Sequence, residues 1–141
     1  MRLLAGMGAL ALAATVAAGA EEPGEKLFFS YCAACHRYDG QEMGEAPPLE
    51  EAEWVTGPES RLIRIVMHGL TGRIVVRGET HDREMPGFGE ILDDEKLAEL
   101  LSFVRRHFGE PSPAISVEAV KKVRQADSGR SRYWTVEELE R

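Results

Sequence analysis

The sequence predicts an all-α domain of three to five helices, with one very short hairpin. Three segments, around residues 24–35, 56–68 and 93–108, repeat apolar residues at the spacing of a single helix face. The β-like run at residues 74–76, before Gly78, is too short to build a sheet of its own. We therefore expect helices to supply the core.

Residues 1–20 have the pattern of a secretory signal peptide. Arg2 is a minimal positive start, an apolar run follows, and Ala18 and Ala20 form an A-x-A cleavage site. We expect cleavage after Ala20, a mature chain from Glu21 and a periplasmic location. The alternative is a membrane anchor formed by an uncleaved N-terminus, which the length and Ala/Gly content of the run disfavour. We expect no membrane span in the mature chain.

The net charge of the mature chain indicates which class of partner it does not bind. The chain has 17 basic and 24 acidic residues, and Arg2 is the one charged residue of the leader, so the mature net charge is −8. An acidic balance of this size argues against nucleic-acid binding. We divide the mature chain into a folded domain at residues 21–109 and a C-terminal extension at residues 110–141.

The first expected helix covers residues 21–35. Its apolar face contains Gly24, Phe28, Tyr31, Cys32 and Cys35. Glycine inside a helix lowers its stability relative to alanine, so a packing reason is expected. We expect another helix to approach closely at Gly24.

A second helix is expected after an irregular segment at residues 38–54 that is rich in Gly and Pro. Thr56 and Glu59 are three residues apart and form a possible capping box at its start, and Gly69 is placed to end it. Its apolar side is formed by Leu62, Ile63, Val66 and Met67.

The clearest helical pattern follows a Gly/Pro-rich loop at residues 84–89. Asp93 is a good N-cap, basic residues occupy the last turn, and Gly109 is placed to stop the helix. The apolar stripe consists of Leu97, Leu100, Leu101, Val104 and Phe108, widened by Phe103.

The extension is sparse in apolar residues. A short helix is expected at residues 116–125, and Thr135 with Glu138 forms a second possible capping box. We expect this extension to be packed on the surface or partly mobile.

The segment Cys32-Ala33-Ala34-Cys35-His36 contains both cysteines of the chain. Two thiols three positions apart share a helix face and can each add to a vinyl group of a haem, while the next residue offers an imidazole to the iron. C-x-x-C-H is therefore typical of one covalently bound haem c, with His36 as the proximal ligand. The alternatives are weaker. A zinc site would want four ligands, a redox dithiol should follow a strand, and a plain disulfide leaves His36 unexplained.

The second axial position of the iron needs a ligand or stays open. Met85 is the predicted distal ligand because Pro86 and two glycines allow its loop to lie flat across a ring, 49 residues beyond His36. The alternative is that Met85 only packs in the core and that His68 or His81 binds the iron. The candidates considered are Met43, Met67, His68, His81, Met85 and His107.

The proximal imidazole also needs an acceptor that fixes its orientation. A backbone carbonyl of Pro47 or Pro48 could serve, since a proline pair stiffens a loop and leaves its carbonyls free, and a plain turn is the alternative.

The order of these motifs resembles class I (mitochondrial-type) cytochrome c over residues 24–108. The resemblance implies a cytochrome c fold around one haem, with the first and last helices crossing at a glycine–aromatic contact. It also implies methionine and histidine ligands on opposite haem faces, and a loop-proline carbonyl on the histidine, which we assign to Pro48. The motifs are Gly24-x-x-x-Phe28-x-x-x-Cys32-x-x-Cys35-His36, Pro48-Leu49, Met85-Pro86 and Leu100-x-x-Phe103.

Residues 57–72 are similar to monohaem cytochrome modules that accompany periplasmic quinoprotein and sugar dehydrogenases. This similarity implies an electron carrier rather than an enzyme, with a periplasmic dehydrogenase as donor and a cytochrome or terminal oxidase as acceptor. The carrier is either a free shuttle or the cytochrome subunit of a dehydrogenase, and the similarity favours the second. The alternative function is a haem peroxidase or a gas or redox sensor, which would need an open or labile sixth position.

Overall fold

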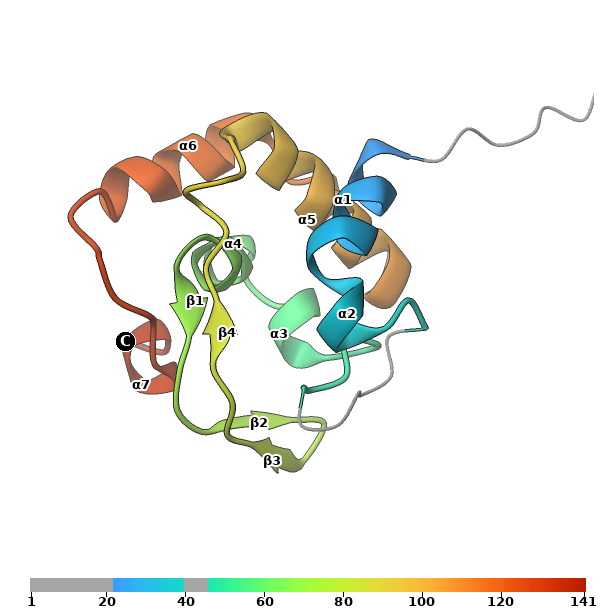
Figure 1. Cartoon of the computed structure of the whole chain (residues 1–141), viewed down its shortest axis with the longest axis vertical. Helices are drawn as coiled ribbons and strands as arrows, with labels where there is room; N and C mark the ends of the chain where they lie inside the picture. Colours follow the sequence, from blue (N-terminus) through green and yellow to red (C-terminus); the bar gives the residue numbers. More distant parts are fainter. Residues whose placement is uncertain (1–21, 40–45) are drawn as a thin grey trace, which may run out of the picture.

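The computed structural model describes residues 22–39 and 46–141. The predicted leader and the candidate ligand Met43 lie outside the described residues. Within them the chain forms seven helices and four short strands (Figure 1). In chain order they are α1 (Pro23–Tyr31), α2 (Ala33–His36), α3 (Glu53–Thr56), α4 (Glu59–His68), β1 (Gly69–Leu70), β2 (Ile74–Val76), β3 (Glu79–His81), β4 (Met85–Pro86), α5 (Asp94–Phe108), α6 (Val117–Ala126) and α7 (Val136–Leu139).

The described helices outnumber the predicted three to five because some are very short. Among the described residues, α2, α3 and α7 are single turns of four residues each. A single turn leaves no periodic apolar stripe from which it can be recognised in a sequence. The longer helices at the predicted segments are present, and the hairpin predicted before the methionine loop is confirmed as β2–β3.

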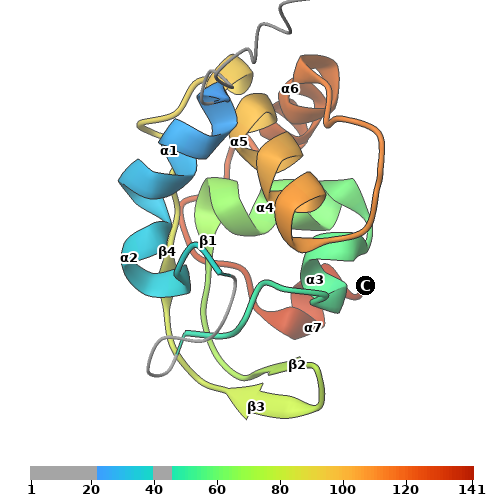
Figure 2. The ribbon, with the colours of Figure 1, turned by 90° about the vertical axis from the view of Figure 1, so that its right-hand side faces the viewer.

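The first and last helices of the predicted domain, α1 and α5, pack side by side (Figure 2). Phe28 is fully buried, and its ring centroid lies 5.8 Å from that of Phe103 and 5.0 Å from that of Phe108. A Cβ atom at Gly24 would come within 2.7 Å of the Phe103 Cβ and would also meet the backbone of Glu99. The expected close approach of a helix at Gly24 is therefore confirmed.

Replacing Gly24 with alanine should destabilise the protein by about 1–3 kcal/mol, the usual cost of overpacking. Alanine would favour an open helix by about 0.5–1 kcal/mol. Here the backbone of Glu99 cannot move aside as a flexible side chain could, so the steric cost outweighs that gain. Denaturant unfolding of the mature protein measures the change. Gly129→Ala is the matched control, since a Cβ there meets nothing within 4 Å; equal midpoints for the two variants would contradict the prediction.

The helix α4 packs against α3, α5 and α6. The predicted capping box at its start is wrong, because Thr56 is the last residue of α3 and its hydroxyl donates to the Ala52 carbonyl at 3.3 Å. Pro58 precedes α4 instead, where its missing N–H and fixed φ suit the first turn. The face of α4 that enters the core consists of Leu62, Ile63, Ile65, Val66 and Met67.

Gly69 ends α4 with φ +83°, as predicted for a helix-stopping glycine, and the chain continues directly into β1. β1 pairs antiparallel with β4, with Leu70 opposite Met85. The hairpin β2–β3 turns through Arg77 and Gly78, both at positive φ, as in a type I′ turn. The chain thus leaves α4, makes the hairpin and returns alongside β1 at Met85 (Figure 1).

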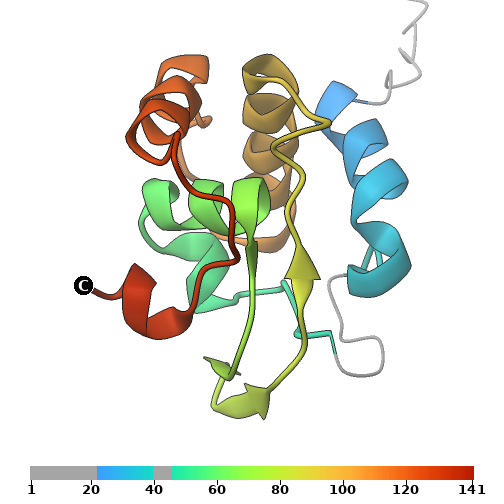
Figure 3. The ribbon, with the colours of Figure 1, turned by 60° about the vertical axis from the view of Figure 1, so that its left-hand side comes forward.

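The C-terminal extension packs on the rest of the chain (Figure 3). The predicted helix appears as α6, capped by Ser116, and it buries Val120 and Val123 against α4 and α5. The chain then passes β1, where Trp134 bridges Leu70, and ends in α7. The capping box predicted from Thr135 and Glu138 is present at the start of α7, with the Glu138 carboxylate accepting from the Thr135 N–H.

Docking of α7 should persist to unusually low pH. Glu138 accepts hydrogen bonds from Arg130 at 2.6 Å and Arg132 at 2.5 Å, which lower the pKa of its carboxyl to about 2. A lowered pKa stabilises the docked form fully above the ordinary glutamate value of 4.5, and this stabilisation is lost as the pH falls towards about 2.

The indole NMR signal of Trp134, followed from pH 6 to pH 2, checks this expectation. The signal should keep its docked position at pH 4 in the wild type and lose it in Glu138→Gln, which cannot carry the charge. A wild-type signal that shifts around pH 4.5 would contradict the assigned pKa.

Within residues 22–39 and 46–141, no helix is both long enough and apolar enough to cross a bilayer.

Candidate functional site

A cavity of about 480 Å³ is enclosed by parts of the chain that are far apart in sequence. Its size and mostly apolar lining, with a few polar groups, are typical of a site for a cofactor. Cys32, Cys35 and His36 line it from the N-terminal side, and Met85 lines it from β4. The apolar walls include Phe28, Pro47, Pro48, Leu49, Trp54, Val55, Leu62, Ile65, Val66, Leu70, Ile74, Val76 and Val104.

The C-x-x-C-H segment does not continue one helix, as was predicted for residues 21–35. The helix α1 ends at Tyr31, Cys32 departs from helical geometry with φ −119°, and α2 begins after it. The amides of Cys35 and His36 both donate to the Cys32 carbonyl, at 3.1 and 2.9 Å. This tight turn keeps both sulfurs and the imidazole on the wall of one cavity.

Cys32 and Cys35 do not form a disulfide with each other, which is the alternative that the sequence left open. Burial, followed by the nearby Cys35, raises the pKa of the Cys32 thiol to about 12. A reactive redox dithiol has the opposite property, a lowered pKa. Within the described residues, no cluster of three or more His, Cys, Asp or Glu side chains is placed to hold a metal ion.

The imidazole of His36 is nearly buried and is oriented by one hydrogen bond. Its Nδ1–H donates to the Pro47 carbonyl oxygen at 3.1 Å. Burial lowers the pKa of His36 and this hydrogen bond raises it, with burial the larger cause. The side chain is therefore neutral near pH 7, and its Nε2 is the nitrogen left to coordinate a metal.

The assignment of this carbonyl to Pro48 is corrected. Pro47 supplies it, and Pro48 lines the cavity with its ring. Either residue of a proline pair presents a free carbonyl, so the choice depends on how the loop turns back towards α2. The sequence carries no signal of that turn.

Met85 is held in place by backbone contacts on both sides of β4. The glycines allow these contacts, since a Cβ at Gly69 would meet the Met85 carbonyl oxygen and one at Gly87 would meet the backbone of His68. Immediately after β4, the amides of Phe88 and Gly89 donate to the last carbonyls of α4 at 2.9 Å each. The position of Met85 is therefore set by the end of α4.

The other described candidates for the second axial position fall into two groups. Met67, His68 and His107 do not line the cavity. Met67 is in the core, as expected, and the Nε2 of His107 bonds the Tyr38 carbonyl at 3.1 Å. His81 does line the cavity, and its buried Nε2 has no hydrogen-bond partner. Of the described candidates, Met85 and His81 therefore remain.

Two polar residues on the cavity wall were not assigned to the site from the sequence, and a third, Trp54, was considered with Arg73 and Arg77 as a contact for the haem propionates. Arg83 and Glu84 line it next to Met85. Trp54 also lines it, but its indole N–H already donates to the Val75 carbonyl at 2.8 Å. A polar residue in a loop is ordinary on any surface, so the sequence offered no signal for the first two.

The residues present fit a covalently held haem. Two thiols for the vinyl groups, a neutral imidazole and a thioether all meet at one apolar cavity. Imidazole and thioether together are a known axial pair for haem iron that raises its reduction potential. The apolar walls would cover the macrocycle and keep water from the iron.

Comparison with known proteins gives a family match. The family model described as "Cytochrome C oxidase, cbb3-type, subunit III" matches residues 19–104. This segment contains the C-x-x-C-H motif, the proline pair and Met85. The match covers more than half of the chain.

The chain is similar to several curated cytochromes. A cytochrome c-552 of Thermus thermophilus is 32% identical over 84% of this chain and 80% of its own length. The fructose dehydrogenase cytochrome subunit of Gluconobacter japonicus is 32% identical over 72% of this chain but only 22% of its own length. The cbb3-type oxidase subunit FixP of Sinorhizobium medicae is 32% identical over 71% of this chain and 34% of its own. The last two relatives thus match this chain through a part of their length.

Proposed function

Because this chain belongs to the cytochrome c family and carries one covalently bound haem c, we propose that it is an exported carrier of single electrons between a periplasmic dehydrogenase and an oxidase or another cytochrome. Electron transfer by a haem is the property of the family. The export, the residues that hold the haem and the two partners are the proposal.

In this proposal four residues hold the haem and a fifth orients one of them. Cys32 and Cys35 form the two thioethers, His36 is the proximal iron ligand and Met85 is the distal one. Pro47 orients His36 through its carbonyl. When bound, the haem supplies an iron that cycles between the ferric and ferrous states. The side chains around it exclude water and fix the ligands, so that little needs to rearrange when one electron arrives or leaves.

The observation that carries the proposal is that Met85 lines the same cavity as His36 and is fixed there by β1 and α4. A bound thioether fills the sixth position, which a peroxidase or a gas sensor needs open. A filled and rigid position supports a carrier rather than a catalyst.

The proposed partners are supported by the relatives. A dehydrogenase cytochrome subunit and an oxidase cytochrome subunit both contain a segment like this chain. The chain as a whole is acidic, with a formal net charge of −7, so it would be steered towards a basic docking face. A small acidic module of this kind could accept electrons from one enzyme and deliver them to another.

Two half-reactions test the proposal separately. The oxidised protein is mixed with fructose and a fructose dehydrogenase prepared without its cytochrome subunit, and the reduced protein is mixed with a cbb3-type oxidase. We expect one electron per chain in each direction, at rates that fall as salt is added. Turnover of hydrogen peroxide, or binding of carbon monoxide by the reduced wild type, would instead favour the reactive-haem alternative.

A further inference from the structure

The strand that carries Met85 is too short to hold itself in place. β4 has two residues and pairs with β1, which also has two. An isolated pair of strands is marginally stable even at several times this length. Additional contacts must therefore hold the segment around Met85, and the C-terminal extension provides them on both sides.

On one side, the extension adds a third backbone segment beside β1. The Trp134 N–H donates to the Gly69 carbonyl at 3.0 Å, and the Thr71 N–H donates to the Trp134 carbonyl at 2.9 Å. These bonds form a parallel bridge between Trp134 and Leu70, whose other neighbour is Met85. β1 is thus enclosed between the methionine strand and the extension.

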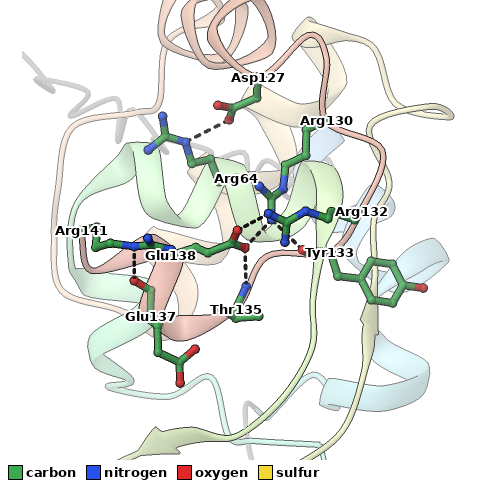
Figure 4. A network of polar contacts seen from close by, with 9 residues as sticks. All are labelled: Arg64, Asp127, Arg130, Arg132, Tyr133, Thr135, Glu137, Glu138 and Arg141. Atoms are coloured by element: carbon green, nitrogen blue, oxygen red, sulfur yellow. Dashed lines mark hydrogen bonds and ion pairs between the residues drawn. The ribbon is translucent and has the colours of Figure 1, made fainter.

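Two arginines lie against the ring of Trp134, Arg130 and Arg64. Figure 4 shows these arginines with their carboxylate partners Glu138 and Asp127. The guanidinium carbon of Arg130 lies 3.3 Å from the Trp134 ring centroid, and the same guanidinium donates at 2.6 Å to Glu138 and to the Tyr133 carbonyl. Side chains of Arg130 and Glu138 are only 12% and 13% exposed, so this ion pair is largely shielded from solvent. A second ion pair joins the extension to α4: Arg64 of α4 donates at 2.9 Å to Asp127, the residue that follows α6.

On the other side of Met85, a single side chain of α6 holds the loop between β4 and α5. Arg124 donates to the Gly89 carbonyl at 2.8 Å and to the Leu92 carbonyl at 3.0 Å. Its third contact is an ion pair with Asp94, in the first turn of α5, at 2.6 Å. One guanidinium therefore ties three points that follow Met85 within nine residues.

We propose that residues 117–139 act as a latch that keeps Met85 on the iron, with Arg124 and the Trp134 segment as its two holding points. The inference rests on the proposed role of Met85 as distal ligand. In a latched protein the methionine leaves the iron rarely, so external ligands bind slowly and the potential stays high. Arg124 and Trp134 are positioning residues in this account, since they act through the backbone on either side of Met85.

The test uses the mature holoprotein with two independent changes. Arg124→Ala removes the downstream holding point, and a chain ending at Gly129 removes Trp134 and α7 while keeping α6. Lys122→Ala is the matched control, because Lys122 is an exposed basic residue of the same helix, α6. Arg124→Lys keeps the charge but cannot reach all three partners, so it should lie between wild type and Arg124→Ala.

Two measurements separate a latch from a general loss of stability. The rate at which imidazole binds the ferric protein, measured well below the unfolding temperature, should rise roughly tenfold or more in both changes and stay near wild type in Lys122→Ala. The weak far-red sulfur-to-iron band should vanish at a lower temperature than the helical circular dichroism, whereas in wild type the two should be lost together.

One result would overturn the latch for a wild type that shows the sulfur-to-iron band. In that result both changes leave the rate of imidazole binding unaltered, and both changed proteins lose the band at the same temperature as their helices. If Arg124→Ala does not fold, the same comparison is made on the shortened chain. A wild type that lacks the band altogether removes the proposed ligand, and the latch with it. The two failures are therefore distinguishable.

Discussion

Replacing Met85 with alanine is expected to leave the haem covalently attached but to lower its reduction potential by roughly 0.1–0.3 V, within the range of about 0.8 V that axial ligands set in haem proteins. The thioether is a soft ligand that favours the ferrous state, so its loss favours the ferric one. The sixth position then opens, and the reduced variant should bind carbon monoxide. Spectroelectrochemistry and a carbon monoxide difference spectrum measure both effects.

Two matched variants keep this prediction specific. Met67→Ala removes the same kind of side chain from the core at a place that does not line the cavity, so it should cost stability without changing the spectrum. His81→Ala removes the remaining rival on the cavity wall. If His81→Ala opens the sixth position and Met85→Ala leaves the spectrum and potential unchanged, the distal ligand is His81.

Replacing both Cys32 and Cys35 with alanine should abolish covalent haem. It should also prevent a stable fold, because the haem fills the cavity around which the helices pack. Without the haem, the apolar side chains around this cavity of about 480 Å³ would lack packing partners, which lowers the free energy of unfolding. A domain is stable by only about 5–15 kcal/mol, so a loss of this kind is large. A haem-stained denaturing gel and circular dichroism of the double variant test the two effects.

Each single cysteine variant is the control, since one remaining thioether should still hold some haem on the gel. A double variant that keeps stain after denaturation would show that the attachment lies elsewhere. A colourless double variant with wild-type helicity would show instead that the helices do not depend on the haem.

Much of the fold could be predicted because its helices carry their own signals. The helix α5 starts after Asp93, whose side chain accepts from the Lys96 amide at 2.9 Å, as an N-cap should. Gly24 predicted a helix contact because glycine in a helix needs a packing reason, and that contact is present. The N-cap prediction succeeds because Asp93 and Lys96 are three residues apart, and the Gly24 prediction succeeds because it required a close helix contact without naming the distant partner.

The errors arise where the outcome depends on distant contacts. Thr56 and Glu59 have the spacing of a capping box, but Thr56 is used to end α3 and Pro58 starts α4. The break of the first helix at Cys32 is likewise absent from the apolar pattern. Pattern alone cannot choose between two local solutions that both satisfy it.

The candidate site shows the same division. The C-x-x-C-H motif and Met85 could be found because thiols, an imidazole and a thioether are the groups that bind haem in proteins. The choice of Pro47 over Pro48, and the three bonds of Arg124 to the loop after Met85, could not be found. They depend on how the loop and the extension return to the domain, which no local spacing encodes.

The visible spectrum of the oxidised and reduced wild-type protein tests the central claim most directly. We expect the bands of a six-coordinate haem c in both states, together with the weak far-red sulfur-to-iron band in the oxidised state. That result would establish covalent haem and methionine ligation in one measurement. A six-coordinate spectrum without the far-red band would contradict the assignment of Met85. A five-coordinate reduced haem would contradict that assignment and also the account of this protein as a simple carrier.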